Sequence, residues 1–443
     1  MIKFALWLIL PVLLVNSNLF AQWSTVAQLT PSELGSYPSV SVPNCSTVVI
    51  AGGSNNVPKI FMTTNSGLNF TDITGNITTN ELYCIYALNS DTIFAGDGGS
   101  PGGSGGNARV YKTVNGGLNW SVMLSTGGNN GFISGIKFSK TNPEFGIIAS
   151  DPATTTDSFW IAKTHDRGKT WQLTEAPQTA PYITQNSLFV VDSLFYGFGL
   201  ITTPPKIYMT TNGGVTWSVK TLGLTGTSVP SIAFQNDKLN AIALSDAVAP
   251  NIARTTNGGL NWETINNGAN LTYAGIVKWI PGTEIYFMAS GFMKRTSDNG
   301  STWESMETGE VVNFRQMDIY RSSAISICAY ALAVNGKIIR FEGEPFGIDP
   351  ENTNVPVRYA LEQNYPNPFN PVTTIKYSVP SAGNIKLAVF DLNGRLIKEL
   401  VNSHHHTGNY IESVDMSAYA SGIYIYELSS EDVSISKKMA LIK

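Results

Sequence analysis

The octapeptide Thr113-Val-Asn-Gly-Gly-Leu-Asn-Trp120 occurs in six variants along this chain of 443 residues. Each copy begins with threonine, has Asn or Asp two positions later and Gly four positions later, and ends with an aromatic residue. The Asn and Asp residues are Asn65, Asn115, Asp166, Asn212, Asn257 and Asp298. The aromatic residues are Phe70, Trp120, Trp171, Trp217, Trp262 and Trp303. Their spacing, 41 to 51 residues, indicates a repeat architecture.

The residue types in the repeat suit a tight turn between two strands. An Asn or Asp side chain can accept hydrogen bonds from nearby backbone N–H groups, Gly tolerates positive φ, and the Thr hydroxyl adds a further local bond. The aromatic residue then begins the next strand and offers a large surface for packing between neighbouring sheets. We therefore expect the residues of the repeat to be structural.

The sequence before each repeat predicts three further strands. Residues 231–234 and 241–244, for example, are apolar runs separated by turn residues, and residues 251–254 form the strand that leads into the repeat. Each unit thus reads as a four-stranded sheet in which the repeat joins the third strand to the fourth. With 41 glycines and only 14% charged residues, the composition also favours many short strands joined by turns.

The last unit lacks its own fourth strand, and the beginning of the chain has a candidate for it. Residues 314–340 contain three strands and no intact repeat, whereas Trp23 lies in a segment that resembles those following the repeats. We predict that Trp23 pairs with the strand near Ile338 and closes the ring, which hides both sheet edges. The prediction for residues 22–345 is an all-β, seven-bladed β-propeller.

The six copies resemble the Asp-box, also called the BNR repeat, of sialidases, xyloglucanases, sortilin-type receptors and the propeller factors that help assemble photosystem II. Sialidases also carry an arginine cluster, an Arg-Ile-Pro signature near the N-terminus and a Tyr/Glu pair. This chain has no Arg-Ile-Pro, and its first arginine is Arg109. Xyloglucanases pair two propellers, whereas this chain has room for one. The resemblance therefore implies a propeller fold. The lack of these further features argues against sialidase and xyloglucanase activity.

Carboxylates on one face of the propeller are the candidates for catalysis. Loops between second and third strands share the face opposite the repeat turns, and they carry Asp97, Asp151, Asp157 and Asp246. Glycoside hydrolysis requires two carboxyl groups about 5 to 10 Å apart. Asp97, Asp151 and Asp246 are therefore candidates for catalysis. The alternative is that they are ordinary solvated loop residues without a catalytic role.

The pattern changes after a Pro-, Asp- and Asn-rich segment at residues 346–357, which we interpret as a linker. Alternating strands and an Asn393-Gly394 hairpin turn then predict a small antiparallel, Ig-like β-sandwich over residues 358–443. Four motifs carry a resemblance to the type IX sorting domain of Bacteroidetes: Asn364-Tyr-Pro-Asn-Pro-Phe-Asn-Pro371, Val389-Phe-Asp-Leu-Asn-Gly394, Ala420-Ser-Gly-Ile-Tyr424 and Lys437-Lys-Met-Ala-Leu-Ile-Lys443. It implies that the type IX outer-membrane translocation machinery is a partner, and that the cargo is released or attached to the cell surface.

The first 21 residues read as a cleaved signal peptide, with Lys3, an apolar run at residues 4–15 and Ala21 at the expected cleavage site. No later run of apolar residues is long enough for a transmembrane segment. The net charge of −4 and the lack of a basic run argue against a nucleic-acid partner. We expect a secreted or surface-attached protein.

The cysteines and histidines suggest no cofactor or metal. Cys45, Cys84 and Cys328 have no metal-binding spacing, and an odd number allows at most one disulfide bond. We favour interpreting them as small buried residues. His165 is expected at the surface, and His404-His405-His406 in a solvated loop.

A regular propeller without a recognisable catalytic set favours a non-enzymatic module that binds a glycan or a protein. The alternative is a divergent BNR-repeat glycoside hydrolase, sialidase-like or xyloglucanase-like, that uses the candidate aspartates.

Overall fold

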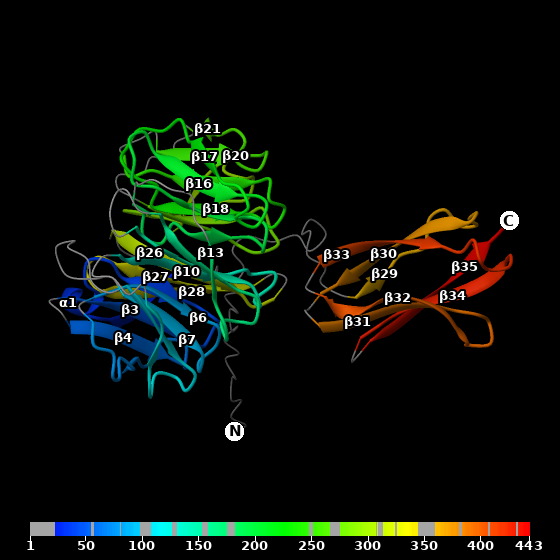
Figure 1. Cartoon of the computed structure of the whole chain (residues 1–443), viewed down its shortest axis with the longest axis horizontal. Coiled ribbons are helices and arrows are strands. Elements are labelled where there is room, and N and C mark those ends of the chain that lie inside the picture. The colour runs from blue at the N-terminus through cyan, green and yellow to red at the C-terminus, as the bar shows by residue number, and fades with distance from the viewer. Residues whose placement is uncertain are drawn as a thin grey trace, which may run out of the picture.

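The computed structural model describes residues 23–54, 57–79, 81–97, 108–125, 131–152, 158–174, 182–247, 251–265, 275–306, 308, 313–323, 326–343, 359–380, 383–405, 408–430 and 433–443. The predicted signal peptide and the predicted linker lie outside these residues. Among the described residues, Figure 1 shows many strands and one short helix, α1 (Pro31–Leu34). Within the described ranges, no helix is long and apolar enough to cross a membrane.

Seven four-stranded antiparallel sheets precede residue 345 in the described chain. The first contains β2 (Ser39–Ser41), β3 (Val48–Ser54), β4 (Val57–Thr63) and β5 (Thr71–Asp72). The second contains β6 (Leu82–Ala87), β7 (Ile93–Asp97), β8 (Arg109–Thr113) and β9 (Ser121–Ser125). The third contains β10 (Ile133–Phe138), β11 (Gly146–Ser150), β12 (Trp160–Thr164) and β13 (Gln172–Thr174). The fourth contains β14 (Phe189–Val190), β15 (Tyr196–Gly199), β16 (Lys206–Thr210) and β17 (Ser218–Thr221).

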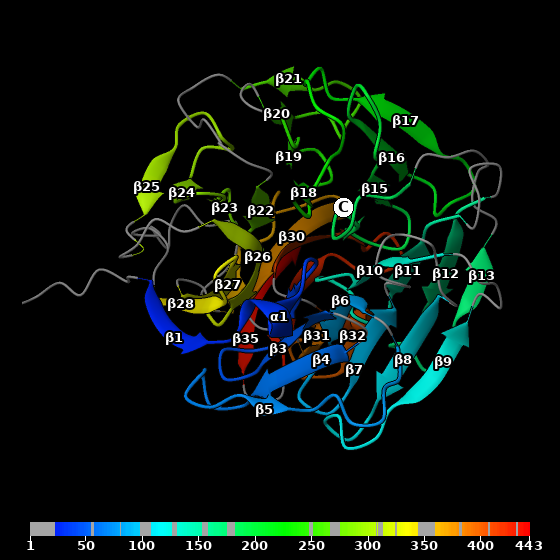
Figure 2. The ribbon, with the colours of Figure 1, turned by 90° about the vertical axis from the view of Figure 1, so that its left-hand side faces the viewer.

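The remaining three sheets complete this set. The fifth contains β18 (Ser231–Phe234), β19 (Ala241–Leu244), β20 (Ile252–Thr255) and β21 (Glu263–Thr264). The sixth contains β22 (Ile276–Trp279), β23 (Tyr286–Ala289), β24 (Met293–Thr296) and β25 (Glu304–Met306). The seventh contains β26 (Phe314–Arg321), β27 (Ile327–Ala333), β28 (Lys337–Gly343) and, from the other end of the chain, β1 (Ser24–Gln28). Figure 2 shows the sheets around one axis, each with its first strand innermost, which is a β-propeller.

The N-terminal strand closes the ring as the sequence predicts, although the predicted pairing of Trp23 itself was wrong. β1 pairs antiparallel with β28, and Thr25 lies opposite Ile339 in the register. Trp23 precedes the paired residues and packs by its ring instead, 5.6 Å from Phe341 and 6.3 Å from Phe287 between ring centroids. The seventh sheet therefore combines both ends of the propeller segment.

The repeat turns join the third strand to the fourth in six sheets, also as predicted. In the third sheet, the Thr164 hydroxyl donates to Oδ1 of Asp166 at 2.7 Å, and the Gly168 N–H donates to the Thr164 oxygen at 2.9 Å. The Thr170 N–H donates to Asp166 Oδ1 at 2.9 Å, and Gly168 has a φ of 71°, a conformation that favours glycine. The other five turns have the same three bonds.

The tryptophans after the turns pack against the neighbouring sheet. The Trp171 ring lies edge-on to Phe138 of its own sheet and to Phe94 of the preceding sheet, with centroids 5.7 and 6.1 Å apart. Aromatic burial of this kind holds adjacent sheets together over a continuous apolar interface.

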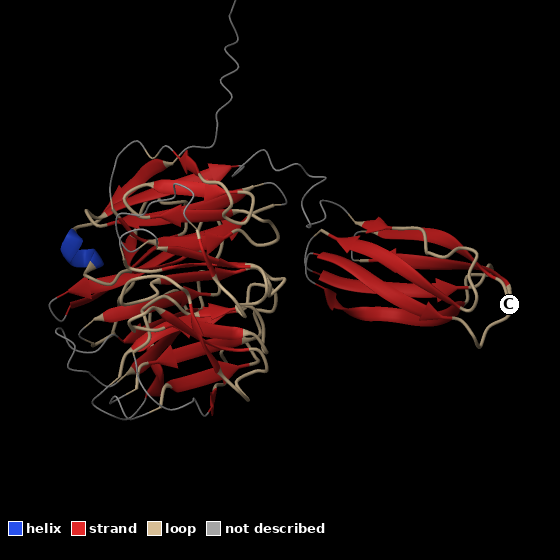
Figure 3. Cartoon of the chain, turned by 90° about the horizontal axis from the view of Figure 1, so that it is seen from above, coloured by secondary structure: helices blue, strands red, loops and turns tan. Residues whose placement is uncertain are grey.

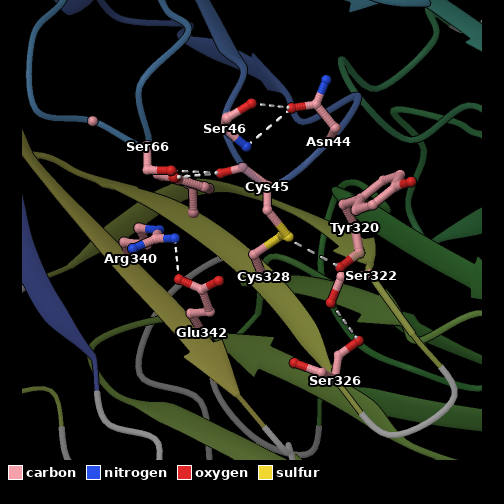
Figure 4. Close-up of polar contacts among 12 residues, drawn as sticks. Asn44, Cys45, Ser46, Ser66, Tyr320, Ser322, Ser326, Cys328, Arg340 and Glu342 are labelled. Carbon is pink, nitrogen blue, oxygen red and sulfur yellow. Dashed lines mark hydrogen bonds and ion pairs between the residues drawn. A yellow bond between two sulfur atoms is a disulfide. The ribbon is translucent and has the colours of Figure 1, made fainter.

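Two of the cysteines form a disulfide bond, so our interpretation of them as small buried residues was wrong for these two. Cys45, between β2 and β3, bonds to Cys328 in β27, across 283 positions of sequence (Figure 4). The Tyr330 hydroxyl donates to the Cys45 carbonyl at 3.1 Å. Sequence spacing could not reveal this pair, because the two residues meet only when the first and seventh sheets become neighbours. Cys84 is a buried free thiol, as expected.

The C-terminal residues form a second all-β unit of two facing sheets (Figure 3). One sheet contains β29 (Ala360–Leu361), β30 (Val372–Val379) and β33 (Gly408–Asp415). The other contains β31 (Gly383–Phe390), β32 (Leu396–His405), β34 (Gly422–Ser429) and β35 (Ser434–Leu441). They enclose an apolar core that includes Tyr377, Leu387 and Tyr426. The predicted turn at Gly394 joins β31 to β32, and its φ is 77°.

The expectation of a solvated histidine loop was wrong for the residues that the structure describes. His404 and His405 belong to β32, and Nε2 of His405 lies 2.9 Å from the Tyr377 hydroxyl. The His405 ring also contacts Tyr410, with centroids 4.3 Å apart. Pairing with β31 extends the strand through this segment, and His406 lies outside the described residues. His165 is exposed, as predicted.

Candidate functional site

A cavity of about 860 Å³ opens where the innermost strands of all seven sheets begin. Its wall consists of the segments that lead into these innermost strands. Residues that follow the second strand of the third, fourth and seventh sheets complete it. The lining residues are Ser36, Tyr37, Pro38, Tyr83, Gly131, Phe132, Ser134, Asp151, Pro152, Tyr182, Ile183, Thr184, Gln185, Asn186, Ile201, Pro230, Gly275, Ile276, Asn313, Phe314, Arg315, Gln316 and Val334. We call this space the mouth cavity. Its volume suits a ligand of several sugar rings or a few amino acids.

Aromatic rings form one continuous side of the mouth cavity. Tyr37 meets Tyr83 edge-on at 4.9 Å between centroids, and Tyr83 stacks on Phe132 at 5.4 Å. Tyr182 also lines the cavity. Tyr37 and Tyr182 are 47% and 41% exposed, so both side chains are accessible to a ligand. No motif in the sequence marks these four residues, which lie in or just before the first strands of four different sheets.

Hydrogen bonds between sheets hold the rim of the mouth cavity in place. The Gln185 side-chain amide donates to the backbone carbonyls of Tyr37 and Tyr83, which belong to the first and second sheets. Arg315 donates to the carbonyls of Gly35 and Ser36 at 2.9 and 2.7 Å. The aromatic side is thus fixed before any ligand binds, which reduces the entropy lost on binding.

Asp151 is the candidate aspartate that lines the mouth cavity. It follows β11, and one of its carboxylate oxygens accepts from the Ile183 N–H at 2.6 Å. Burial disfavours the ionised form and raises the pKa of Asp151 to about 7, although the hydrogen bond from Ile183 acts in the opposite direction. The carboxyl group therefore changes charge near neutral pH.

Glu81 is a second buried carboxyl group close to this site. It is 9% exposed, and burial raises its pKa. Burial also raises the pKa of the Tyr83 hydroxyl, with further contributions from the charges of Glu81, Tyr37 and Asp151. Glu81 and Tyr83 lie at the start of the second sheet, and Asp151 follows a strand of the third sheet. No local pattern in the sequence marks Glu81, so only the packing of these two sheets reveals that the three residues are close.

The other candidate aspartates have different surroundings. Asp97 ends β7 as a buried residue opposite Leu82, and Asp246 accepts from the N–H groups of Thr227 and Ser228 at 2.7 and 3.0 Å. Neither lines the mouth cavity. Asp157 lies outside the described residues. In the described part of the chain, no three His, Cys, Asp or Glu side chains are grouped so as to hold a metal ion.

The comparisons with known proteins agree with this architecture. Residues 363–443 match the family model of the secretion system C-terminal sorting domain. No curated protein sequence matches the chain. The chain is thus a β-propeller protein with a C-terminal sorting domain of the type IX system, which marks it as secreted and then attached to the cell surface or released.

Solved structures similar to this chain are also propellers. YCF48 bound to D1 peptide is 17% identical, with a TM-score of 0.52 over 73% of this chain and 96% of that chain. YCF48 from Cyanidioschyzon merolae is 15% identical, with a TM-score of 0.50 over 72% and 99%. A chain of the mitotic checkpoint complex is 10% identical, with a TM-score of 0.52 over 78% and 98%. At such identities the likeness concerns the fold alone.

Proposed function

We propose that this chain is a non-enzymatic glycan-binding propeller, exported by the type IX system and presented outside the cell. The single observation that carries the proposal is the mouth cavity, whose wall combines aromatic rings with amides and one carboxyl group. Sugar rings have apolar C–H faces that pack on aromatic rings and hydroxyl groups that bond to amides and carboxylates. Both kinds of partner are present here, and the N-terminal 21 residues would direct the first step of export.

The first experiment measures binding of the purified protein to arrays of glycans and peptides, then repeats it with Tyr182→Ala. Tyr182 is exposed, so its removal leaves the fold intact, and the lost ring contact should weaken glycan binding about tenfold. Tyr365→Ala is the matched control, because this tyrosine is 82% exposed and belongs to the C-terminal domain. Equal glycan affinities of the Tyr182 variant and the parent would contradict the mouth cavity as the site. If the protein bound peptides and no glycans, the proposed ligand would be a protein and not a glycan.

The charge of Asp151 adds a pH dependence to this binding. An ionised carboxylate accepts hydrogen bonds from sugar hydroxyls, and its pKa of about 7 means that ionisation increases between pH 6 and pH 8. Glycan affinity should therefore rise over this range, and Asp151→Asn should remove the dependence. Isothermal titration at several pH values measures both proteins.

A divergent glycoside hydrolase is the second candidate, favoured by one observation: Asp151 and Glu81 are both buried carboxyl groups with raised pKa values near Tyr83. A general acid must be protonated near the working pH, which a raised pKa permits. Mass spectrometry of the glycan panel after incubation tests this candidate. New products that disappear with Asp151→Asn and with Glu81→Gln would replace the binding proposal, and an unchanged panel would reject hydrolysis of those glycans.

A further inference from the structure

A second, much smaller cavity lies in the central channel of the propeller, next to the mouth cavity. Asn186 and Gln316 line both spaces. The small cavity has a volume of about 10 Å³ and is also lined by Lys137 of β10, Lys278 of β22 and Asp318 of β26. A space of this size holds one water molecule or one small ion. We call it the channel cavity.

The charged groups around the channel cavity are out of balance. Lys137 and Lys278 are half-buried, line the same small cavity, and lie close enough for the charge of Lys137 to lower the pKa of Lys278. Asp318 is 9% exposed, accepts from the Val42 N–H at 2.9 Å, and acts electrostatically on both lysines. Two ammonium groups therefore share one carboxylate, which leaves an excess of one positive charge.

The other titratable groups facing this cluster do not supply the missing negative charge. Lys140 is exposed and interacts with Asp318 as a third cation. Burial raises the pKa values of the Tyr86 hydroxyl and the Cys84 thiol, so both stay neutral at physiological pH. Tyr320 interacts electrostatically with Lys140.

An uncompensated charge inside a protein is unfavourable, and two responses are available. Lys278 can lose its proton, since burial and the neighbouring Lys137 lower its pKa to about 7. Alternatively, an anion can enter between the two amino groups, keep both lysines charged and neutralise the cluster. Each lysine would then donate a charge-assisted hydrogen bond to the anion.

We propose that the channel cavity binds one small monovalent anion, of halide size, between the amino groups of Lys137 and Lys278. The anion with Asp318 balances the two half-buried lysines, and the cavity volume excludes polyatomic anions such as sulfate. Because the lysines come from the third and sixth sheets, a bound anion links two sheets on opposite arcs of the ring. It therefore stabilises the assembled propeller, independently of any ligand in the mouth cavity.

Chloride-dependent thermal unfolding of the purified protein tests this site. Sodium chloride replaces sodium gluconate from 1 to 100 mM at constant ionic strength, so that general screening does not change. The midpoint temperature of propeller unfolding should rise by about 3 to 5 °C if the anion binds with millimolar affinity. Lys278→Met should lose this rise, because it removes one of the two donors and the excess charge. Lys169→Met is the matched control, since Lys169 is exposed at a position where the first two repeat turns carry Leu68 and Leu118.

Crystals grown in sodium bromide provide a test that does not depend on a variant. An anomalous scattering peak in contact with both amino groups would support the site. An unoccupied channel cavity at 100 mM bromide would overturn the proposal. A midpoint temperature of propeller unfolding that does not change with chloride, as expected if Lys278 is neutral, would also overturn the proposal. The same would follow if chloride raised this temperature equally in Lys278→Met and in the parent.

Discussion

At the scale of the residue, the repeat turn depends on one acidic or amide side chain. Asp166 accepts from the N–H groups of Lys169 and Thr170 and from the hydroxyls of Thr164 and Thr170. These bonds, the one from the Thr170 side chain first, favour the ionised carboxylate and hold the pKa of Asp166 well below its usual range. Four of the other turns have Asn at the same position, where Oδ1 accepts the same backbone bond.

Asp166→Ala should lower the free energy of unfolding by about 1 kcal/mol at pH 7, because the turn loses its acceptor. Asp166→Asn should cost less, since Asn serves in four equivalent turns. The pKa is depressed in the folded state, so the carboxylate contributes stability above about pH 4, the ordinary pKa of aspartate, and loses this contribution as the pH falls further. Urea unfolding at pH 7 and pH 3 measures all three proteins. Glycan affinity should not change, and weaker binding without weaker stability would contradict a structural role.

At the scale of the element, the described part of the N-terminal segment contributes the closing strand β1 to the seventh sheet. Its anchor is Trp23, which is 4% exposed and belongs to the same apolar cluster as Phe287 and Phe341. The pairing hides the edge of β28, which would otherwise present open backbone groups. The strand thus protects the propeller from opening and from edge-to-edge association.

Trp23→Ala should lower the free energy of unfolding of the propeller by about 3 to 5 kcal/mol, since it removes a large ring from a buried cluster. Trp23→Phe is the matched variant, because the Trp23 indole N–H has no acceptor among the described residues and an aromatic ring remains. It should cost about 1 kcal/mol. Chemical denaturation followed by fluorescence or circular dichroism gives both values. Equal losses for the two variants would show that ring packing is not what anchors β1.

At the scale of the whole molecule, the disulfide bond gives the ring a second closure. Cys45 and Cys328 link the first and seventh sheets directly (Figure 4), and β1 links them because the chain continues from it into the first sheet. A cross-link across 283 residues strongly restricts the unfolded chain, and the effect grows with the length of the loop. An exported protein can form such a bond because it leaves the reducing cytoplasm.

The double variant Cys45→Ala, Cys328→Ala should therefore lose about 3 to 5 kcal/mol of unfolding free energy, seen as a drop of at least about 5 °C in the propeller transition. Differential scanning calorimetry with and without dithiothreitol measures this. The reductant should destabilise the parent and leave the double variant unchanged, because Cys84 is a buried free thiol. If the reductant affects both proteins alike, the stabilisation does not come from this bond.

The sequence predicted the sheets, the turns and the ring closure well, because each depends on local signals. Thr, Asn or Asp, and Gly specify a turn within eight residues, and Trp23 repeats the pattern that follows the other turns. The candidate site was predicted only in part. Asp151 lines the mouth cavity, whereas Asp97 and Asp246 have equivalent positions in the chain and do not. Loop position alone does not tell which of these side chains reaches the axis.

The sequence by itself determined the two all-β units, the structural role expected of the repeat and the sorting domain at the C-terminus. The tertiary structure alone decided the pairing of Cys45 with Cys328, the burial of Glu81 and the grouping of Tyr37, Tyr83 and Phe132. A turn or a strand follows from hydrogen bonds and side-chain patterns between residues close in sequence. A cavity at the axis forms only when closure of the ring brings together segments from all seven sheets, and no short stretch of sequence contains that information.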